Sequence, residues 1–241
     1  AYPTDINKPY DLTFLIVDND LATFDNWEFN DLPEPTTTDG IGEARGAKFK
    51  LSQNINDMPA GVYQLRVQAF QRPDAIEQTY EQWLAGTDNA KTYIYGNSIV
   101  NKTVVANIVR DAQPSPMGGS EQKAGELYVP NDVIAVANYF SQGLYDNNVT
   151  FKQSKRNELT IGISNVSSKF ADDDWSAFTN LRLYNYGNKF TKTEVAEATA
   201  ITDIAFDDNK QSAVVYDLTG RPISAPTKGV YIINGKKVVV K

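Results

Sequence analysis

The sequence contains no cysteine and no histidine, and these two absences remove most familiar enzyme chemistry. Without cysteine the chain has no disulfide, no thiolate metal site and no cysteine nucleophile. Without histidine it has no Ser-His-Asp triad, no histidine-bound zinc or iron, and no ordinary general base near neutral pH. We therefore expect a non-catalytic protein. A glycoside hydrolase stays as an alternative, because a pair of carboxylates can run that reaction without histidine.

Positive charge and long apolar runs are also scarce. The net charge is −7 and the isoelectric point is about 4.7. Proteins that bind phosphate backbones need clustered Lys and Arg, so nucleic acid is not an expected partner. No apolar run reaches the ~18 residues needed to cross a bilayer. Insertion into a membrane is therefore not expected either.

The residues that are abundant favour strands. The chain has 13 Tyr, 11 Phe and 3 Trp but only 2 Met, and its other apolar residues are mainly Val and Ile, which suit a pleated surface. We predict an all-β protein in which Trp175 and Phe178 close the core. Strands are expected within residues 45–70, 91–97, 99–108, 148–153, 157–166 and 178–187.

Three segments interrupt the strand pattern. Residues 74–86 have helical composition and end at Gly86, which predicts a short helix in a long connection. Residues 111–130 are rich in Pro, Gly and Ser and predict a long loop. A second short helix, capped by Asn131, is expected to end near Gly143.

The chain divides into two parts. The first, 1–187, carries most of the strand signals, and the polar, alanine-rich stretch 188–200 predicts a linker. The remaining 201–241 predict a small β module that ends in a hairpin. Asn-Gly at 234–235 favours a two-residue turn, which pairs Tyr231 with Val238 and Ile233 with Lys236.

The small module resembles the C-terminal sorting domain of proteins exported by the type IX secretion system of Bacteroidetes. The similar segments are "VVYDLTGRPIS" (214–224) and "KGVYIINGKKVVVK" (228–241). The resemblance implies export to the outside of the cell or to its outer surface. It also implies that the secretion machinery is a partner of residues 201–241.

The larger part resembles the galactose-binding-like β-sandwiches, related to carbohydrate-binding modules, of secreted proteins from the same bacteria. The resemblance implies a jelly-roll sandwich with short helices in its connections. It is carried by "MPAGVYQLRVQAFQR" (58–72), "YFSQGLYDNNVTF" (139–151), "LTIGI" (159–163) and "WSAFTNLRLYNYG" (175–187). These motifs are mostly scaffold, so they support the fold more than the function.

Four aromatic residues are candidates for sugar binding. Trp83 and Tyr80 lie in the predicted helix, and Tyr93 and Tyr95 lie in the strand that follows. Aromatic rings exposed on loops stack on the apolar faces of sugar rings. The alternative is that Trp83 and Tyr80, three residues apart, attach the helix to the sandwich.

Two acidic runs are candidates for a structural calcium ion. Asp18 and Asp20 form one run, and Asp172 and Asp173 belong to the other. Calcium takes oxygen ligands from loops of this kind. The alternative is that these residues occupy solvated turns, where Asp is common. No other cofactor is expected.

Together these observations predict a secreted or surface-exposed protein that binds a glycan or surface polysaccharide. A structural or adhesive protein whose sandwich binds another protein is the first alternative. The glycoside hydrolase is the third hypothesis.

Overall fold

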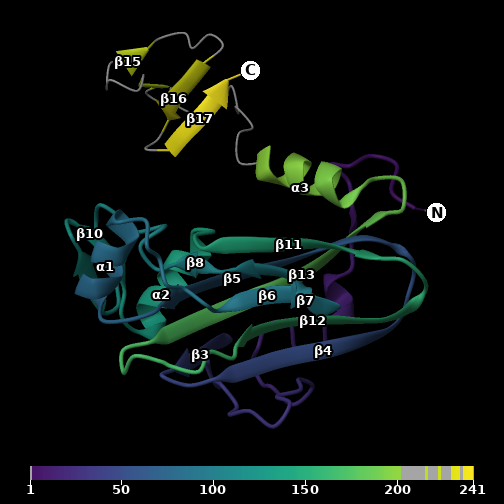
Figure 1. Cartoon of the computed structure of the whole chain (residues 1–241), viewed down its shortest axis with the longest axis horizontal. Helices are drawn as coiled ribbons and strands as arrows, with labels where there is room; N and C mark the ends of the chain where they lie inside the picture. Colours follow the sequence, from purple (N-terminus) through teal and green to yellow (C-terminus); the bar gives the residue numbers. More distant parts are fainter. Residues whose placement is uncertain (1, 202–214, 217–221, 224–228, 234–235, 241) are drawn as a thin grey trace. The chain divides into compact units, whose positions relative to one another are not determined.

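Two mainly antiparallel sheets packed face to face form most of the unit Ala1–Ala200 (Figure 1). The large sheet has the order β11-β5-β13-β3-β2, and the small sheet has the order β4-β12-β6-β7. The main strands are β3 (Ile41–Arg45), β4 (Phe49–Met58), β5 (Gly61–Arg72), β6 (Tyr93–Gly96), β7 (Ser98–Val104), β11 (Asp146–Gln153), β12 (Asn157–Asn165) and β13 (Trp175–Gly187). Short β1 (Tyr10–Asp11), β2 (Thr36–Thr38) and β8 (Ala106–Asn107) extend the large sheet.

The chain connects the sheets in the jelly-roll order. It crosses from one sheet to the other after β3, β4, β5, β7, β11 and β12, so that β3-β13-β5-β11 faces β4-β12-β6-β7. This is the double Greek key of a jelly roll. The all-β sandwich predicted from the composition and from the family resemblance is therefore confirmed.

The computed structural model describes residues 2–201, 215–216, 222–223, 229–233 and 236–240. None of the helices in these ranges is long and apolar enough to cross a membrane.

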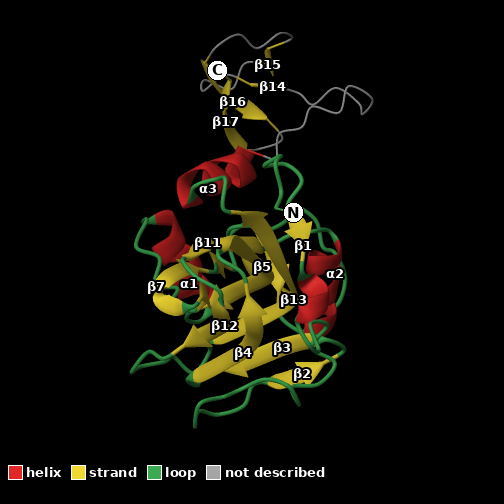
Figure 2. Ribbon diagram, turned by 90° about the vertical axis from the view of Figure 1, so that its right-hand side faces the viewer, coloured by secondary structure: helices red, strands yellow, loops and turns green. Residues whose placement is uncertain are grey.

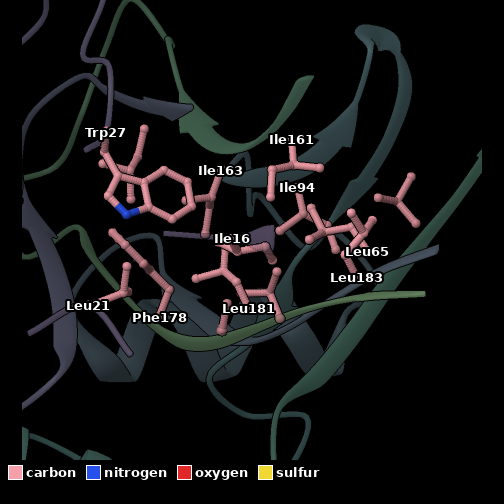
Figure 3. Packing of buried hydrophobic residues seen from close by; sticks show 14 of the residues in the cluster. Ile16, Leu21, Trp27, Leu65, Ile94, Ile161, Ile163, Phe178, Leu181 and Leu183 are labelled. Carbon is pink, nitrogen blue, oxygen red and sulfur yellow. The ribbon is translucent and has the colours of Figure 1, made fainter. Parts of the chain in front are cut away.

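The main core lies between the two sheets. In β12, alternate residues Leu159, Ile161 and Ile163 are fully buried. They face side chains of the large sheet such as Leu65 and Leu183 (Figure 3). Period-two alternation places these residues on one face of the strand, and burial of each such side chain contributes ~1.5–3 kcal/mol.

The outer face of the large sheet carries a second core. Phe70 and Trp175 are fully buried there, with ring centroids 5.1 Å apart. Figure 1 shows the covering elements at one end of the sheet, and Figure 2 draws the helices in red. They are α1 (Ile76–Leu84), α2 (Val133–Ser141), and the hairpin of β9 (Glu121–Ala124) and β10 (Leu127–Pro130).

This covering layer confirms one prediction and corrects two. α1 lies within the predicted 74–86. Residues 111–130 are not one long loop, because they contain the β9–β10 hairpin. Asp132, not Asn131, caps α2, since its side chain accepts a hydrogen bond of 2.8 Å from the backbone N–H of Ala135.

Residues 188–200 do not form the predicted linker, because most of them belong to α3 (Lys192–Ile201). Val195 of this helix is fully buried against Val62 and Tyr186 of the large sheet. Nε2 of Gln64 also donates to Oγ1 of Thr199 over 2.8 Å. α3 therefore also covers the large sheet, at the opposite end from α1 and α2 (Figure 1).

The unit Ile201–Lys241 contains one antiparallel sheet of order β15-β14-β16-β17. Its strands are β14 (Val215–Tyr216), β15 (Pro222–Ile223), β16 (Gly229–Ile233) and β17 (Lys236–Val240). The predicted register is confirmed, because Tyr231 pairs with Val238 and Ile233 with Lys236. The predicted turn residues 234–235 lie outside the described residues.

Because Val195 fixes α3 to the large sheet, the substitution Val195→Ala should lower the free energy of unfolding by about 1–3 kcal/mol. Urea denaturation measures this change. The control Thr193→Ala removes an exposed side chain of the same helix and should change stability by less than ~0.5 kcal/mol. Equal stability of the two variants would show that α3 does not pack on the sheet.

Candidate functional site

The outer face of the small sheet is polar, unlike that of the large sheet. In β4, Leu51 and Ile55 are buried in the main core, whereas the alternate residues Lys50 and Asn54 face outward. α1, α2 and α3 all pack on the large sheet. The small sheet therefore keeps a face that side chains of β4, β12 and β6 present to solvent.

A groove of about 290 Å³ lies on this face. One wall is the segment around Glu28, whose backbone pairs with β4 at Ser52, and the other wall is Ser98–Ile99 at the start of β7. The floor comes from three neighbouring strands and the residue after β6, and consists of Lys50, Ser52, Asn54, Thr160, Tyr95 and Asn97.

Tyr95 is the unusual residue of this floor. Its side chain is only 3% exposed, yet its hydroxyl has no hydrogen-bond partner among the described residues. The neighbouring Ser52 hydroxyl accepts from Nδ2 of Asn30 and donates to the carbonyl of Glu28, and Ser52 lies close enough to Tyr95 to lower the pKa of its hydroxyl. A buried polar group without a partner costs ~1–3 kcal/mol, so a role in binding is a physical reason to retain it.

The tyrosine ring is held in place by Gly162 of β12. A Cβ atom at this position would lie 2.7 Å from carbon atoms of the Tyr95 ring, so only glycine leaves room for the ring. Burial raises the pKa of Tyr95 to about 12, and Ser52 opposes part of that rise. The hydroxyl therefore stays protonated at physiological pH and can donate a hydrogen bond.

Hydrogen bonds fix the other polar side chains of the floor. Oγ1 of Thr160 donates to Oδ1 of Asn54 over 2.7 Å, which leaves the Asn54 amide nitrogen on the exposed side. Nδ2 of Asn97 donates to Oε1 of Gln153 over 2.9 Å. Side chains fixed in this way lose little conformational entropy when a ligand binds.

A second groove, of about 360 Å³, continues the first. The two grooves share Asn97 and Thr160. The second is bordered by Lys152–Lys155 and Asn157–Glu158 around the turn between β11 and β12. A continuous polar strip therefore crosses the small sheet from the segment at Glu28 to this turn.

The four predicted aromatic residues form two separate groups. Trp83 and Tyr80 of α1 are partly buried against the second core, as in the packing alternative. Tyr93 and Tyr95 of β6 lie on the small sheet with ring centroids 6.0 Å apart, and both are buried. No shared stacking platform forms from the four, and Tyr95 alone lies in the groove.

The predicted calcium ligands lie in turns. The carboxylate of Asp18 accepts a hydrogen bond of 2.7 Å from Nδ2 of Asn26, and that of Asp20 accepts from the N–H of Ala22. Asp172 and Asp173 are exposed. The described residues bring no three acidic side chains together around one point. Calcium binding stays a prediction.

A buried carboxylate, Asp174, stands apart from the grooves and has a structural role. Nε2 of Gln71 donates to its Oδ2 over 2.7 Å, and Oε1 of Gln71 accepts from the backbone N–H of Thr92 over 2.8 Å. This network joins the chain before β6 to the large sheet. Burial raises the pKa of Asp174 to about 6, against smaller lowering effects of Gln71 and nearby Lys91 and Arg72.

The sequence is not similar to any family for which a model was compared, and a search of curated proteins also gives no match.

The raised pKa of Asp174 predicts an unusual dependence of stability on pH. Its pKa is about 6 in the folded state and ~4 in the unfolded state, so the folded state binds the proton more tightly. This stabilisation is complete below pH ~4 and is lost as the pH rises through about 6. Asp174→Asn removes the titration but keeps an acceptor for Gln71.

Relative to Asp174→Asn, the wild type should therefore gain about 1–3 kcal/mol of stability when the pH falls from 7 to 4. Urea unfolding at several pH values measures this difference. Asp172→Asn, at an exposed neighbour, is the control for the loss of one surface charge. A pH-independent difference between wild type and Asp174→Asn would contradict the raised pKa.

Proposed function

We propose that this chain is a non-catalytic protein that binds a polysaccharide across the outer face of the small sheet. The observation that carries the proposal is the Tyr95 hydroxyl, which is buried and unpaired on the floor of a polar groove. A ligand hydroxyl in the groove would accept this hydrogen bond after the side chains above the buried oxygen shift. The desolvation cost that the free protein bears at Tyr95 would then be recovered on binding.

The chemistry of the groove favours a ligand rich in hydroxyl groups. Asn54 offers an amide nitrogen that donates hydrogen bonds, and Thr160 offers a hydroxyl oxygen that accepts them. Glu28 and Lys50 are the charged residues of this groove, one of each sign. A neutral sugar matches such a surface better than a polyanion, because a chain of net charge −7 repels anions over long distances.

The two adjoining grooves favour a chain of sugars over a single ring. A volume of about 290 Å³ is at the lower end of ligand-binding cavities. The neighbouring groove of about 360 Å³ extends the same strip through Asn97 and Thr160. Because the face of the Tyr95 ring is buried, the affinity would come from hydrogen bonds. Stacking on exposed aromatic side chains, which the sequence analysis predicts, would not contribute.

Secretion, a location on the outer surface, and a role of residues 201–241 in export stay predictions. They rest on the family resemblance of the terminal segment.

The test begins with a glycan array probed with the full chain, and continues with Tyr95→Phe against the glycan that binds best. This substitution removes only the unpaired hydroxyl. The dissociation constant should rise about three- to tenfold, the effect of one hydrogen bond. The melting temperature should stay the same or increase, because the variant no longer buries an unsatisfied polar atom.

Tyr93→Phe is the matched control, since Tyr93 precedes Tyr95 on the same face of β6 but does not line the groove. It should bind the glycan as the wild type does. If Tyr95→Phe binds as tightly as the wild type, or loses stability, the hydroxyl has a structural role and the proposed site is wrong.

A further inference from the structure

The outer face of the large sheet carries an arginine between its two covered ends. Val62 of β5 packs with α3, and Phe70 of the same strand packs in the second core with α2. Arg66 stands four residues from each of them. Its neighbours Leu65 and Val67 belong to the main core, so period-two alternation directs Arg66 to the outer face. Arg66 therefore lies between the helical covers.

The register of the sheet places a second arginine directly beside the first. Asn148 of β11 and Arg182 of β13 are the cross-strand partners of Arg66, one on each side. The residues next to both partners belong to the main core, so these side chains also face outward. Like charges directly opposite each other on neighbouring strands lower stability. The Arg66–Arg182 pair therefore needs a compensating interaction.

The neighbouring carboxylates compensate the other arginines but not Arg66. Arg182 forms an ion pair with Asp146, and Arg110 forms one with Asp111 over 2.8 Å. The ion pairs between described residues do not include Arg66. Arg66 is nevertheless half-buried. A cation that is partly removed from water is stabilised by an anion, and within the described residues Arg66 has none.

The guanidinium of Arg66 is held in place along one edge. Its Nε donates to Oε1 of the fully buried Gln64 over 2.7 Å, and its Nη2 donates to the hydroxyl of Tyr186 over 3.5 Å. The guanidinium carbon also lies 4.9 Å from the centroid of the Tyr184 ring. A side chain fixed in this way loses little conformational entropy when a ligand binds.

The opposite edge of the guanidinium is open. No described residue accepts a hydrogen bond from Nη1 of Arg66, and this atom is not among the buried polar atoms of the described residues, so solvent reaches it. Nη1 and the second N–H of Nη2 form the end edge of the guanidinium. Two parallel N–H groups on such an edge match the two oxygens of a carboxylate.

We propose that Arg66 is the centre of a second ligand site, which binds the carboxylate group of an acidic sugar or of another small organic acid. The carboxylate accepts two hydrogen bonds from the open edge of Arg66 and supplies the missing negative charge. This site lies on the outer face of the large sheet. It is independent of the glycan groove, which lies on the outer face of the small sheet.

The charges around Arg66 select a monoanion. Because Asp146 already pairs with Arg182, the site has one positive charge to neutralise. A planar carboxylate matches both this charge and the planar edge of the guanidinium, whereas a phosphate or sulfate dianion carries one charge too many. The net charge of −7 repels anions over long distances, but salt screens this repulsion and leaves the local contact with Arg66.

The probe is glucuronate, titrated into the full chain and followed by NMR. The Nε–H signal of Arg66 and the backbone amides of Arg66 and Asn148 should shift in a saturable way. The matched ligand is the methyl ester of glucuronate, which keeps the sugar but lacks the charge. It should bind at least about tenfold more weakly, because hydrogen bonds to a charged group are lost.

Propionate distinguishes the two sources of the carboxylate. Equal affinity for propionate and glucuronate would identify the carboxylate alone as the ligand group, as in a small organic acid. Tighter binding of glucuronate would identify an acidic sugar whose ring contributes to the affinity.

Variants of the protein locate the site independently. Arg66→Gln should abolish binding and should leave the melting temperature the same or higher, because the repulsion by Arg182 is removed. Arg66→Lys keeps the charge but lacks the paired N–H groups, so it should also weaken binding. Arg156→Gln, at an exposed ion pair with Asp57, removes the same charge and should bind as the wild type does.

The ion pair beside the site gives a test in the opposite direction. Asp146→Asn leaves Arg182 without its carboxylate, so that two cations face the ligand. Glucuronate should then bind about two- to fivefold more tightly.

Three results would overturn the proposal. Arg66→Gln could bind glucuronate as tightly as the wild type, or the methyl ester could bind as tightly as the acid. Alternatively, the shifted signals could lie away from Arg66 and Asn148. Tighter binding of inorganic sulfate or phosphate than of glucuronate would contradict the assignment to a carboxylate.

Discussion

The central constraint on this fold is that β5, an inner strand of its large sheet, is buried on both faces. Along the whole length of β5 (Gly61–Arg72), every residue except Arg66 is buried, and Arg66 is half-buried. One face of that strand packs in the main core through residues such as Leu65, and the other packs outside it through Phe70. A sandwich of two sheets alone would leave Phe70 and Trp175 in water. The connections must therefore supply a third layer.

That layer explains where the helices lie and where the open surface is. α1, α2 and the β9–β10 hairpin cover one end of the large sheet, and α3 covers the other. Because these elements pack on the large sheet, the outer face of the small sheet is open to solvent. It presents Lys50, Asn54 and Thr160 there. The polar groove is a consequence of this asymmetry.

Much of the fold could be predicted because it depends on local alternation. The strands of the sandwich, the burial of Trp175 and Phe178, and the register of the terminal hairpin all follow from spacing and turn residues. The sequence does not reveal α3, because its composition is polar and Val195 is the one fully buried side chain within residues 192–199. A capping box was the available signal: Oγ1 of Thr191 accepts from the N–H of Glu194, whose carboxylate accepts from the N–H of Thr191.

The site was harder to predict because no motif marks it. Ser52, Asn54 and Thr160 are ordinary outward-facing polar residues, and only the register of β4 with β12 brings Asn54 opposite Thr160. The sequence predicts an exposed stacking role for Tyr95, but the burial of Tyr95 depends on a long-range contact with Gly162. It predicts the same role for Trp83, and the second core that holds Trp83 comes from segments distant in sequence.

The most direct test of the central claim is an amide NMR titration of the full chain with the oligosaccharide that binds best on a glycan array. The open face of the small sheet predicts chemical-shift changes in Lys50–Asn54, Tyr95–Asn97 and Thr160, with little change in α1. Changes centred on Trp83 and Tyr80, or an array on which no glycan binds, would contradict the assignment of the function to this face.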